Sequence, residues 1–195
     1  MKFDNIPGAT PLPPDAEKDL KRRISTQGEL NTLETLNIQK AREWVPTSRI
    51  MRDHYPSVKA LLRLHREMFD LTWKWAGKYR NIETTIGLNP YYRVPMAVIM
   101  LCNNTRFWIE NNTFPWDELG VRFHHRLVEI HPFNNGNGRH AREATDALMM
   151  QNGQPLFTWG PESLAAIGNT RATYITALQA ADGGDYAPLM AFVRT

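Results

Sequence analysis

The sequence predicts a single, mostly α-helical domain that is interrupted by one β-hairpin. Its 195 residues suit one domain, and 42% hydrophobic with 22% charged residues is ordinary for a globular chain. Apolar side chains recur at helical spacing along most of the chain. Between residues 78 and 94 that spacing gives way to strand-favouring side chains and turn residues.

The amino-terminal segments are predicted to be an irregular arm and a longer helix. The proline-rich residues 1–25 form the arm, which ends in a short helix. Thr26 and Glu29 then have the spacing of a helix capping box, and apolar residues follow at helical spacing. We expect a helix over residues 26–45, which Pro46 ends.

The central segment, residues 56–155, is predicted to be the core of the domain. Residues 58–75 form its clearest amphipathic helix, and Gly77 stops that helix. Residues 78–94, called the flap below, are expected to form a β-hairpin, because strand-favouring side chains flank glycine and Asn-Pro turn signals. Further helices are expected at 95–110, 115–130 and 138–151.

The carboxy-terminal segment, residues 156–195, is predicted to add helices at 161–181 and 186–193. No internal repeat, low-complexity tract or linker divides the chain, so residues 1–195 are expected to form one domain. A single cysteine, Cys102, excludes an intramolecular disulfide.

Charge and hydropathy narrow the classes of function. The net charge of +3 and the pI of about 9.1 are only mildly basic, and the basic side chains are scattered. A nucleic-acid partner is therefore disfavoured. The sequence shows neither a secretory signal nor an uncharged run that could cross a bilayer, so we expect a cytoplasmic protein without membrane association.

The most informative segment runs from His131 to Arg142 and reads HPFNNGNGRHAR. Gly136 and Gly138 allow successive backbone N–H groups to point into one concavity, which opens onto the N-terminus of the helix that follows. Arg139 and Arg142 lie on the first turn of that helix, and two guanidinium groups suit two linked phosphates. The segment therefore predicts a site for the phosphates of a nucleotide.

His131 is predicted to lie on the opposite side of this loop, at the end of the preceding helix. A neutral imidazole can take a proton from an attacking hydroxyl group. We therefore expect His131 to be a general base that faces a phosphorus centre. Phe133 is expected to be a structural anchor whose buried ring holds the shape of the loop.

The same segment resembles the signature of the Fic-domain family, HPFx(D/E)GNGRxxR, at every fixed position but one. Residues 73–87 look like the Fic flap and its approach, and residues 122–127 look like the helix that leads into the signature. The tail around Tyr174 and Tyr186 is also similar to Fic proteins. Within the family, the chain most resembles the branch called mobile mystery protein B, which occurs with a small helix-turn-helix partner on mobile elements.

The resemblance implies a Fic-type helical bundle with a β-hairpin flap, acting as a protein adenylyltransferase that moves AMP from ATP to a target protein. His131 would deprotonate a serine, threonine or tyrosine hydroxyl of that target. The residues implied to bind the nucleotide and its phosphates are Asn135, Gly136, Asn137, Gly138, Arg139 and Arg142. The flap residues implied to dock the target by strand-like pairing are Arg80, Asn81, Ile82, Glu83, Thr84 and Thr85.

Asn135 is the one departure from the signature, because most Fic enzymes have there an aspartate or glutamate that binds magnesium. An amide oxygen can ligate magnesium but brings no negative charge. We expect weak Mg²⁺ binding at Asn135 and slow transfer. Two alternatives stay open: a nucleotide-binding protein without turnover, or a Fic protein with another activity, such as transfer of a different phospho-group or de-AMPylation.

Ser25 and Glu29 allow two interpretations. Many Fic proteins restrain themselves with a helix that carries (S/T)xxxE(G/N), whose glutamate pairs with the second arginine of the signature. Ser25 and Glu29 fit this pattern, although Leu30 replaces its Gly or Asn. The simpler interpretation is the capping box, whereas the regulatory hypothesis pairs Glu29 with Arg142. The resemblance also implies a regulated toxin whose antitoxin is the helix-turn-helix partner.

Overall fold

The regular elements of the protein are helices that surround a central pair. The computed structural model describes residues 15–160 and 168–195. Its α-helices there are α1 (Gln27–Trp44), α2 (Arg49–His54), α3 (Val58–Phe69), α4 (Val94–Glu110), α5 (Trp116–Ile130), α6 (Asn137–Gln151), α7 (Asn169–Asp182) and α8 (Ala187–Phe192). The 3-10 helices are η1 (Ala16–Asp19), η2 (Val45–Thr47) and η3 (Tyr91–Arg93).

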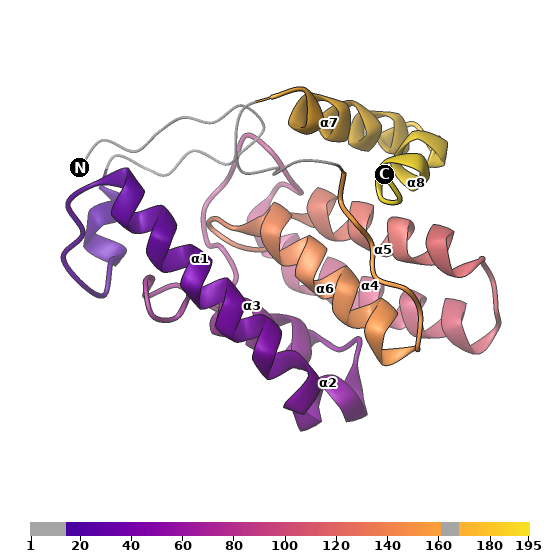
Figure 1. Cartoon of the computed structure of the whole chain (residues 1–195), viewed down its shortest axis with the longest axis horizontal. Helices are drawn as coiled ribbons and strands as arrows, with labels where there is room; N and C mark the ends of the chain where they lie inside the picture. Colours follow the sequence, from indigo (N-terminus) through magenta and orange to yellow (C-terminus); the bar gives the residue numbers. More distant parts are fainter. Residues whose placement is uncertain (1–14, 161–167) are drawn as a thin grey trace.

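Helices α5 and α6 form the centre of this arrangement (Figure 1). Helix α5 also packs against α4, and α3 packs against both α1 and α6. The short helix α8 packs against α7 and α5, which covers the other side of the central pair. Because α5 and α6 supply buried apolar side chains to both of these groups of helices, the loop that joins them is held from two directions.

Side-chain caps determine where α1 and α3 begin. Thr26 Oγ1 accepts a hydrogen bond from the Glu29 N–H (3.1 Å), and the Glu29 carboxylate accepts one from the Ser25 N–H (2.9 Å). Ser57 caps α3 by accepting a hydrogen bond from the Ala60 N–H (3.3 Å). Such a cap satisfies a backbone donor and contributes about 1 kcal/mol to helix stability. Helix α1 therefore begins at the capping box found in the sequence.

The apolar periodicity predicts that helix α3 continues to Trp75, but the helix ends at Phe69. The following residues leave the helix and contact the amino-terminal turn through an isolated β-bridge between Leu20 and Trp73. The Trp73 indole is fully buried and donates a hydrogen bond to Glu34 (2.7 Å). The apolar pattern beyond Phe69 thus reflects burial of side chains in a turn.

The predicted β-hairpin at residues 78–94 is wrong, because no strand occurs there or elsewhere in the described ranges. The flap is an irregular loop that is organised by the buried side chain of Arg80. Its Nε donates a hydrogen bond to the His131 carbonyl (2.8 Å), and its Nη atoms donate to the carbonyls of Ile82 (2.9 Å) and Leu88. One guanidinium group therefore binds carbonyls that a hairpin ladder would use, and it overrides the strand preference of the flap side chains.

Other expectations concern the two ends of the chain. The short helix at the end of the amino-terminal arm is the single 3-10 turn η1. Residues 1–14 of the expected arm lie outside the described residues, as do the first residues of the helix expected at 161–181. Across the two described ranges, no helix combines the length and the apolar character that crossing a bilayer requires.

Replacing Arg80 with methionine tests its role as the anchor of the flap. We expect the free energy of unfolding to fall by about 2–4 kcal/mol, because the buried His131 carbonyl and two partly buried flap carbonyls lose a charged donor. Urea unfolding measures this loss, and limited proteolysis should cut residues 78–94 faster. The matched control is Arg126→Met, which removes an exposed ion pair with Glu129 and should change stability by less than about 0.5 kcal/mol. Equal effects of the two variants would contradict the assignment.

Candidate active site

Two left-handed backbone positions shape the loop between α5 and α6. His131 ends α5 with a φ of 53°, and Gly136 precedes α6 with a φ of 78°. A Cβ atom at Gly136 would lie 2.5 Å from the Phe69 ring, so this position requires glycine. The first N–H groups of α6 have no partner within the helix. The loop thus places His131 and an anion-binding helix terminus at its two ends.

Asn137 and Phe133 hold the loop from inside. The Asn137 side chain accepts a hydrogen bond from the Phe133 N–H (2.9 Å) and donates one to the Phe133 carbonyl (2.8 Å). The Phe133 ring is 1% exposed, stacks on the His65 ring at 3.6 Å and meets the His140 ring edge-on at 4.8 Å between centroids. The Asn137 side chain is therefore engaged by the loop itself, so an anion would meet its backbone N–H.

His65 is a supporting residue that the sequence analysis missed. Its Nδ1 accepts a hydrogen bond from the Gly77 N–H (2.9 Å), and its Nε2 lies 3.2 Å from the Asn135 carbonyl. A carbonyl only accepts hydrogen bonds, so Nε2 carries the proton of a neutral ring. Burial, reinforced by the neighbouring His140, holds the pKa of His65 well below its usual value. Its one signal in the sequence is a histidine on the apolar face of α3.

His131 is held as a neutral imidazole. Its Nδ1 lies 3.2 Å from the Val128 carbonyl, so Nδ1 carries the proton and Nε2 carries the lone pair. Burial lowers the pKa of His131 to about 4; the hydrogen bond to Val128 opposes this shift, and the Arg80 charge adds to it. Gly87 of the flap lies against this histidine, since a Cβ atom at Gly87 would come within 2.3 Å of the His131 Cβ. Because Nε2 of the neutral ring carries a lone pair, His131 can accept a proton at neutral pH.

The two arginines of the segment are held by different helices. Arg139 Nη1 donates a hydrogen bond to Glu34 of α1 (2.6 Å). Arg142 contacts α7, where its guanidinium lies 6.0 Å from the Tyr174 ring centroid and hydrogen-bonds that side chain. The Tyr174 hydroxyl in turn lies 2.8 Å from His124 Nε2. Helices α1 and α7 thus fix the two cationic groups that are expected to bind phosphates.

The structure does not bring Glu29 and Arg142 together. Glu29 is exposed and its carboxylate binds the Ser25 N–H, whereas Arg142 contacts Tyr174. The acidic side chain that α1 presents to the site is Glu34, which is buried, binds Arg139 and also accepts the Trp73 hydrogen bond. Glu34 is not recognisable from the sequence, because no short pattern links it to the signature.

The described residues do not form a magnesium site by themselves. Within residues 15–160 and 168–195, no group of three His, Cys, Asp or Glu side chains could hold a metal ion. Asn135 Oδ1, the predicted ligand, accepts hydrogen bonds from the Gly136 N–H (2.7 Å) and from Arg139 Nη2 (3.3 Å). An uncharged oxygen that already faces a guanidinium group is a poor ligand for a hard dication.

The flap presents most of its predicted docking residues to solvent. The exposed ones are Asn81, Ile82, Glu83 and Thr85, and Thr84 is partly buried. Arg80 differs from them because its buried side chain is the anchor of the flap.

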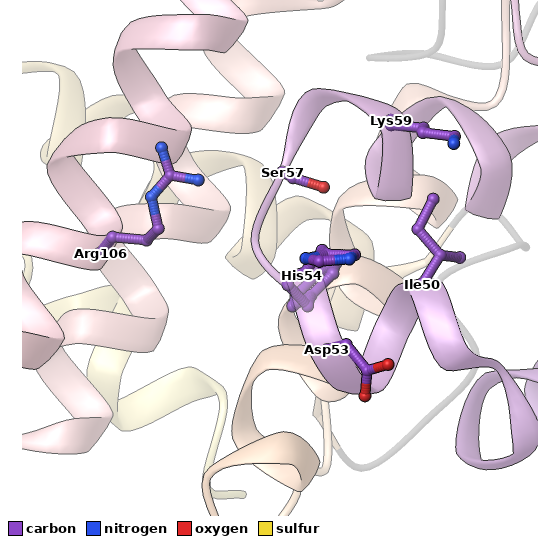
Figure 2. A pocket seen from close by; sticks show the side chains of 7 residues that line it. Ile50, Asp53, His54, Ser57, Lys59 and Arg106 are labelled. Atoms are coloured by element: carbon purple, nitrogen blue, oxygen red, sulfur yellow. The ribbon is translucent and has the colours of Figure 1, made fainter.

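A surface pocket of about 400 Å³ lies away from the signature, where α2 meets α3 beside α4 (Figure 2). It is lined by Ile50, Asp53, His54, Tyr55, Ser57, Lys59 and Arg106. Its charges are mixed, and Arg106 is bound to the Pro56 carbonyl (3.3 Å). None of residues 131–142 lines this pocket, so it is separate from the candidate active site.

Comparison with known proteins gives consistent matches to one family. The family model described as Fic/DOC family matches residues 55–149. Among curated proteins, protein adenylyltransferase fic-1 of Caenorhabditis briggsae is 27% identical over 164 residues, which cover 82% of this chain and 31% of that protein. Protein adenylyltransferase Fic of Aedes aegypti is 24% identical over 164 residues, which again cover 82% of this chain and 31% of that protein. The chain thus spans about a third of the length of these relatives.

Solved structures with the same fold include two that cover most of the chain. Fic-1 (residues 134–508) from C. elegans matches 88% of this chain and 50% of that chain, with a TM-score of 0.69 and 26% identity. BepC of Bartonella tribocorum, solved with bound AMPPNP, matches 89% of both chains with a TM-score of 0.61 and 17% identity. Because the sequence identity to BepC is only 17%, this similarity shows a shared fold alone.

The buried neutral histidines predict a loss of stability in acid. The pKa values of His131 and His140 are lowered to about 4 and that of His124 to about 3, chiefly by burial. Below pH 6.5 the unfolded chain binds more protons than the folded one, so stability falls as the pH drops from 6.5 towards 4. We expect a loss of about 2 kcal/mol per histidine at pH 5.

Urea unfolding at pH 7.5 and pH 5 measures this loss. His140→Gln should reduce the dependence on pH, because it removes one of the buried histidines. Equal stability of the wild-type protein at the two pH values would contradict this prediction.

Proposed function

We propose that the chain is a protein adenylyltransferase that moves AMP from ATP to a hydroxyl group of a target protein, because residues 55–149 match the family model described as Fic/DOC family. The observation that carries the proposal is the α5–α6 loop, which holds a neutral histidine opposite the N-terminus of α6. The names of the curated relatives support it.

His131 is the proposed catalytic base. The target hydroxyl oxygen attacks the α-phosphorus of ATP while its proton moves to Nε2 of His131. The new bond joins that oxygen to phosphorus, and the bond from phosphorus to the bridging oxygen breaks, so pyrophosphate leaves. Bound phosphates place negative charge near the ring and raise the pKa of His131 from its low value in the nucleotide-free protein. ATP binding thereby makes the base stronger.

The phosphates are proposed to bind across the loop and the first turn of α6. The N–H groups of Gly136, Asn137 and Gly138 would donate to phosphate oxygens. Arg139 and Arg142 would each bind a phosphate oxygen through the guanidinium group. For Arg139 this requires exchange of its hydrogen bond to Glu34 for one to the nucleotide.

Magnesium is proposed to enter with the nucleotide, held mainly by the phosphates. The Asn135 oxygen is engaged by the Gly136 N–H and by Arg139 and adds no negative charge, so no step of the reaction is assigned to a metal on this residue.

The target is proposed to dock on the exposed residues of the flap, through a serine, threonine or tyrosine side chain that reaches His131. Flap residues 81–85 precede Gly87, which lies directly against this histidine. A helix-turn-helix partner that restrains the activity, and a cytoplasmic location, belong to the same proposal.

Labelled ATP with magnesium tests the activity. The wild type should label itself or an added target, with the label on a hydroxyl side chain by mass spectrometry. His131→Ala should lower labelling by about 100-fold or more, because the base is lost.

Asn135→Asp should raise magnesium-dependent labelling, and His54→Gln should change nothing. Labelling by His131→Ala at the wild-type rate would refute the assignment; nucleotide binding without label in every variant would identify a nucleotide-binding protein without turnover.

Replacing Glu34 with glutamine tests whether Glu34 competes with the nucleotide for Arg139. The amide oxygen can still accept the Trp73 hydrogen bond, but the charge that holds Arg139 is lost. We expect ATP to bind about fivefold more tightly by calorimetry. The matched control is Glu143→Gln, which removes the other ion pair between α1 and α6, with Arg42, and should leave ATP affinity unchanged. An unchanged affinity for Glu34→Gln would show that the pair does not compete.

A further inference from the structure

Helix α4 carries apolar side chains on its inner face and, beside the exposed Asn103 and Asn104, on its outer face as well. The inner face buries Val94, Ala97, Val98, Leu101, Cys102 and Thr105 against the rest of the domain. The outer face carries large hydrophobic side chains that face solvent, and only Arg106 and Glu110 are charged within the helix. Exposed apolar patches of this kind commonly mark interaction sites. Within residues 15–160 and 168–195, no element covers these side chains.

Large hydrophobic side chains gather on the outer face of α4, where the exposed Asn103 lies between Met100 and Phe107. Of the twelve large hydrophobic side chains that are exposed in the described ranges, six lie between Tyr91 and Phe107, so they are not scattered singly. Tyr92, Met96, Met100 and Phe107 are 69%, 60%, 56% and 57% exposed. Their spacing of four, four and seven residues places them on one side of α4 and its preceding turn. We call these four residues, with Ile99, the α4 stripe.

We propose that the α4 stripe is the interface of a two-fold symmetric dimer, in which α4 of a second copy packs antiparallel across it. A two-fold axis beside the Leu101–Cys102 peptide brings Met96 opposite the partner's Phe107, a favourable sulfur–aromatic contact. The same axis brings Met100 opposite the partner's Asn103. The pair of Met96 with the partner's Phe107 therefore occurs twice, once on each side of the axis.

Charges at the two ends of the helix fit the same arrangement. Arg93 directly precedes α4 and Glu110 is its last residue, and both side chains are exposed. The axis that pairs Met96 with the partner's Phe107 also places Arg93 near the partner's Glu110. Neither residue forms an ion pair with another described residue. A cation near the carboxy-terminal end of the partner's helix is favoured by the helix dipole as well.

The size of the stripe fits a dimer interface. The exposed side chains between Tyr91 and Phe107 present roughly 700 Å² per copy, close to the ~800 Å² that each partner buries in a stable interface. The largest apolar patch on a typical monomer is about 300–600 Å². The stripe itself carries no charge, so two copies meet without repulsion or loss of charge hydration.

Sedimentation velocity over a concentration series tests the dimer. The wild type should change from monomer to dimer with a Kd in the micromolar range. Met100→Glu, which puts two like charges at the centre of the interface, should weaken the dimer at least about 100-fold while circular dichroism stays unchanged. The matched control is Leu36→Glu, at a side chain of α1 that is 52% exposed, and it should dimerise like the wild type.

Charge reversal tests the antiparallel orientation. Arg93→Glu and Glu110→Arg should each weaken the dimer about fivefold to tenfold, and the double variant should regain the wild-type Kd. A wild type that remains monomeric at high concentration would overturn the proposal, as would a Met100→Glu variant that still dimerises. A double variant weaker than both single ones would exclude the antiparallel pairing. AMP transfer is measured separately, so its absence would leave these outcomes unaffected.

Discussion

The paired hydrogen bonds between the Asn137 side chain and the Phe133 backbone are the constraint on which the site depends. They close the turn between α5 and α6 and direct the Phe133 ring onto His65. His65 then binds the backbone of Asn135 on one side and of Gly77 on the other. The buried Asn137 amide thus connects the α5–α6 loop, helix α3 and the approach to the flap.

The sequence was sufficient to locate the helices and the signature, because both depend on local chemistry. Side-chain periodicity, proline, glycine and the capping box at Thr26 and Glu29 act over a few residues. The predicted helix starts agree with the structure at Gln27 and Val58, where side-chain caps mark them. The family resemblance rests on twelve consecutive residues and is matched by a family model over 55–149.

The errors and omissions have a common physical cause, which is contact between residues distant in sequence. Arg80 binds carbonyls of its own loop and of His131, and this removes the hairpin that local preference predicted. Glu34 lies 105 residues from its partner Arg139, and no spacing rule connects them. His65 was missed for the same reason. Such side chains gain their roles from the tertiary fold, which local patterns do not encode.

The anchoring of the flap through Arg80 has an evolutionary consequence. Its guanidinium group binds main-chain carbonyls of the flap, and every amino acid provides the same carbonyl. The shape of the loop is therefore nearly independent of the side chains at positions 81–86. Mutations there can therefore change the exposed side chains while the loop keeps its path over His131. Under the proposed function, descendants of this chain can thus acquire new targets without rebuilding the α5–α6 loop.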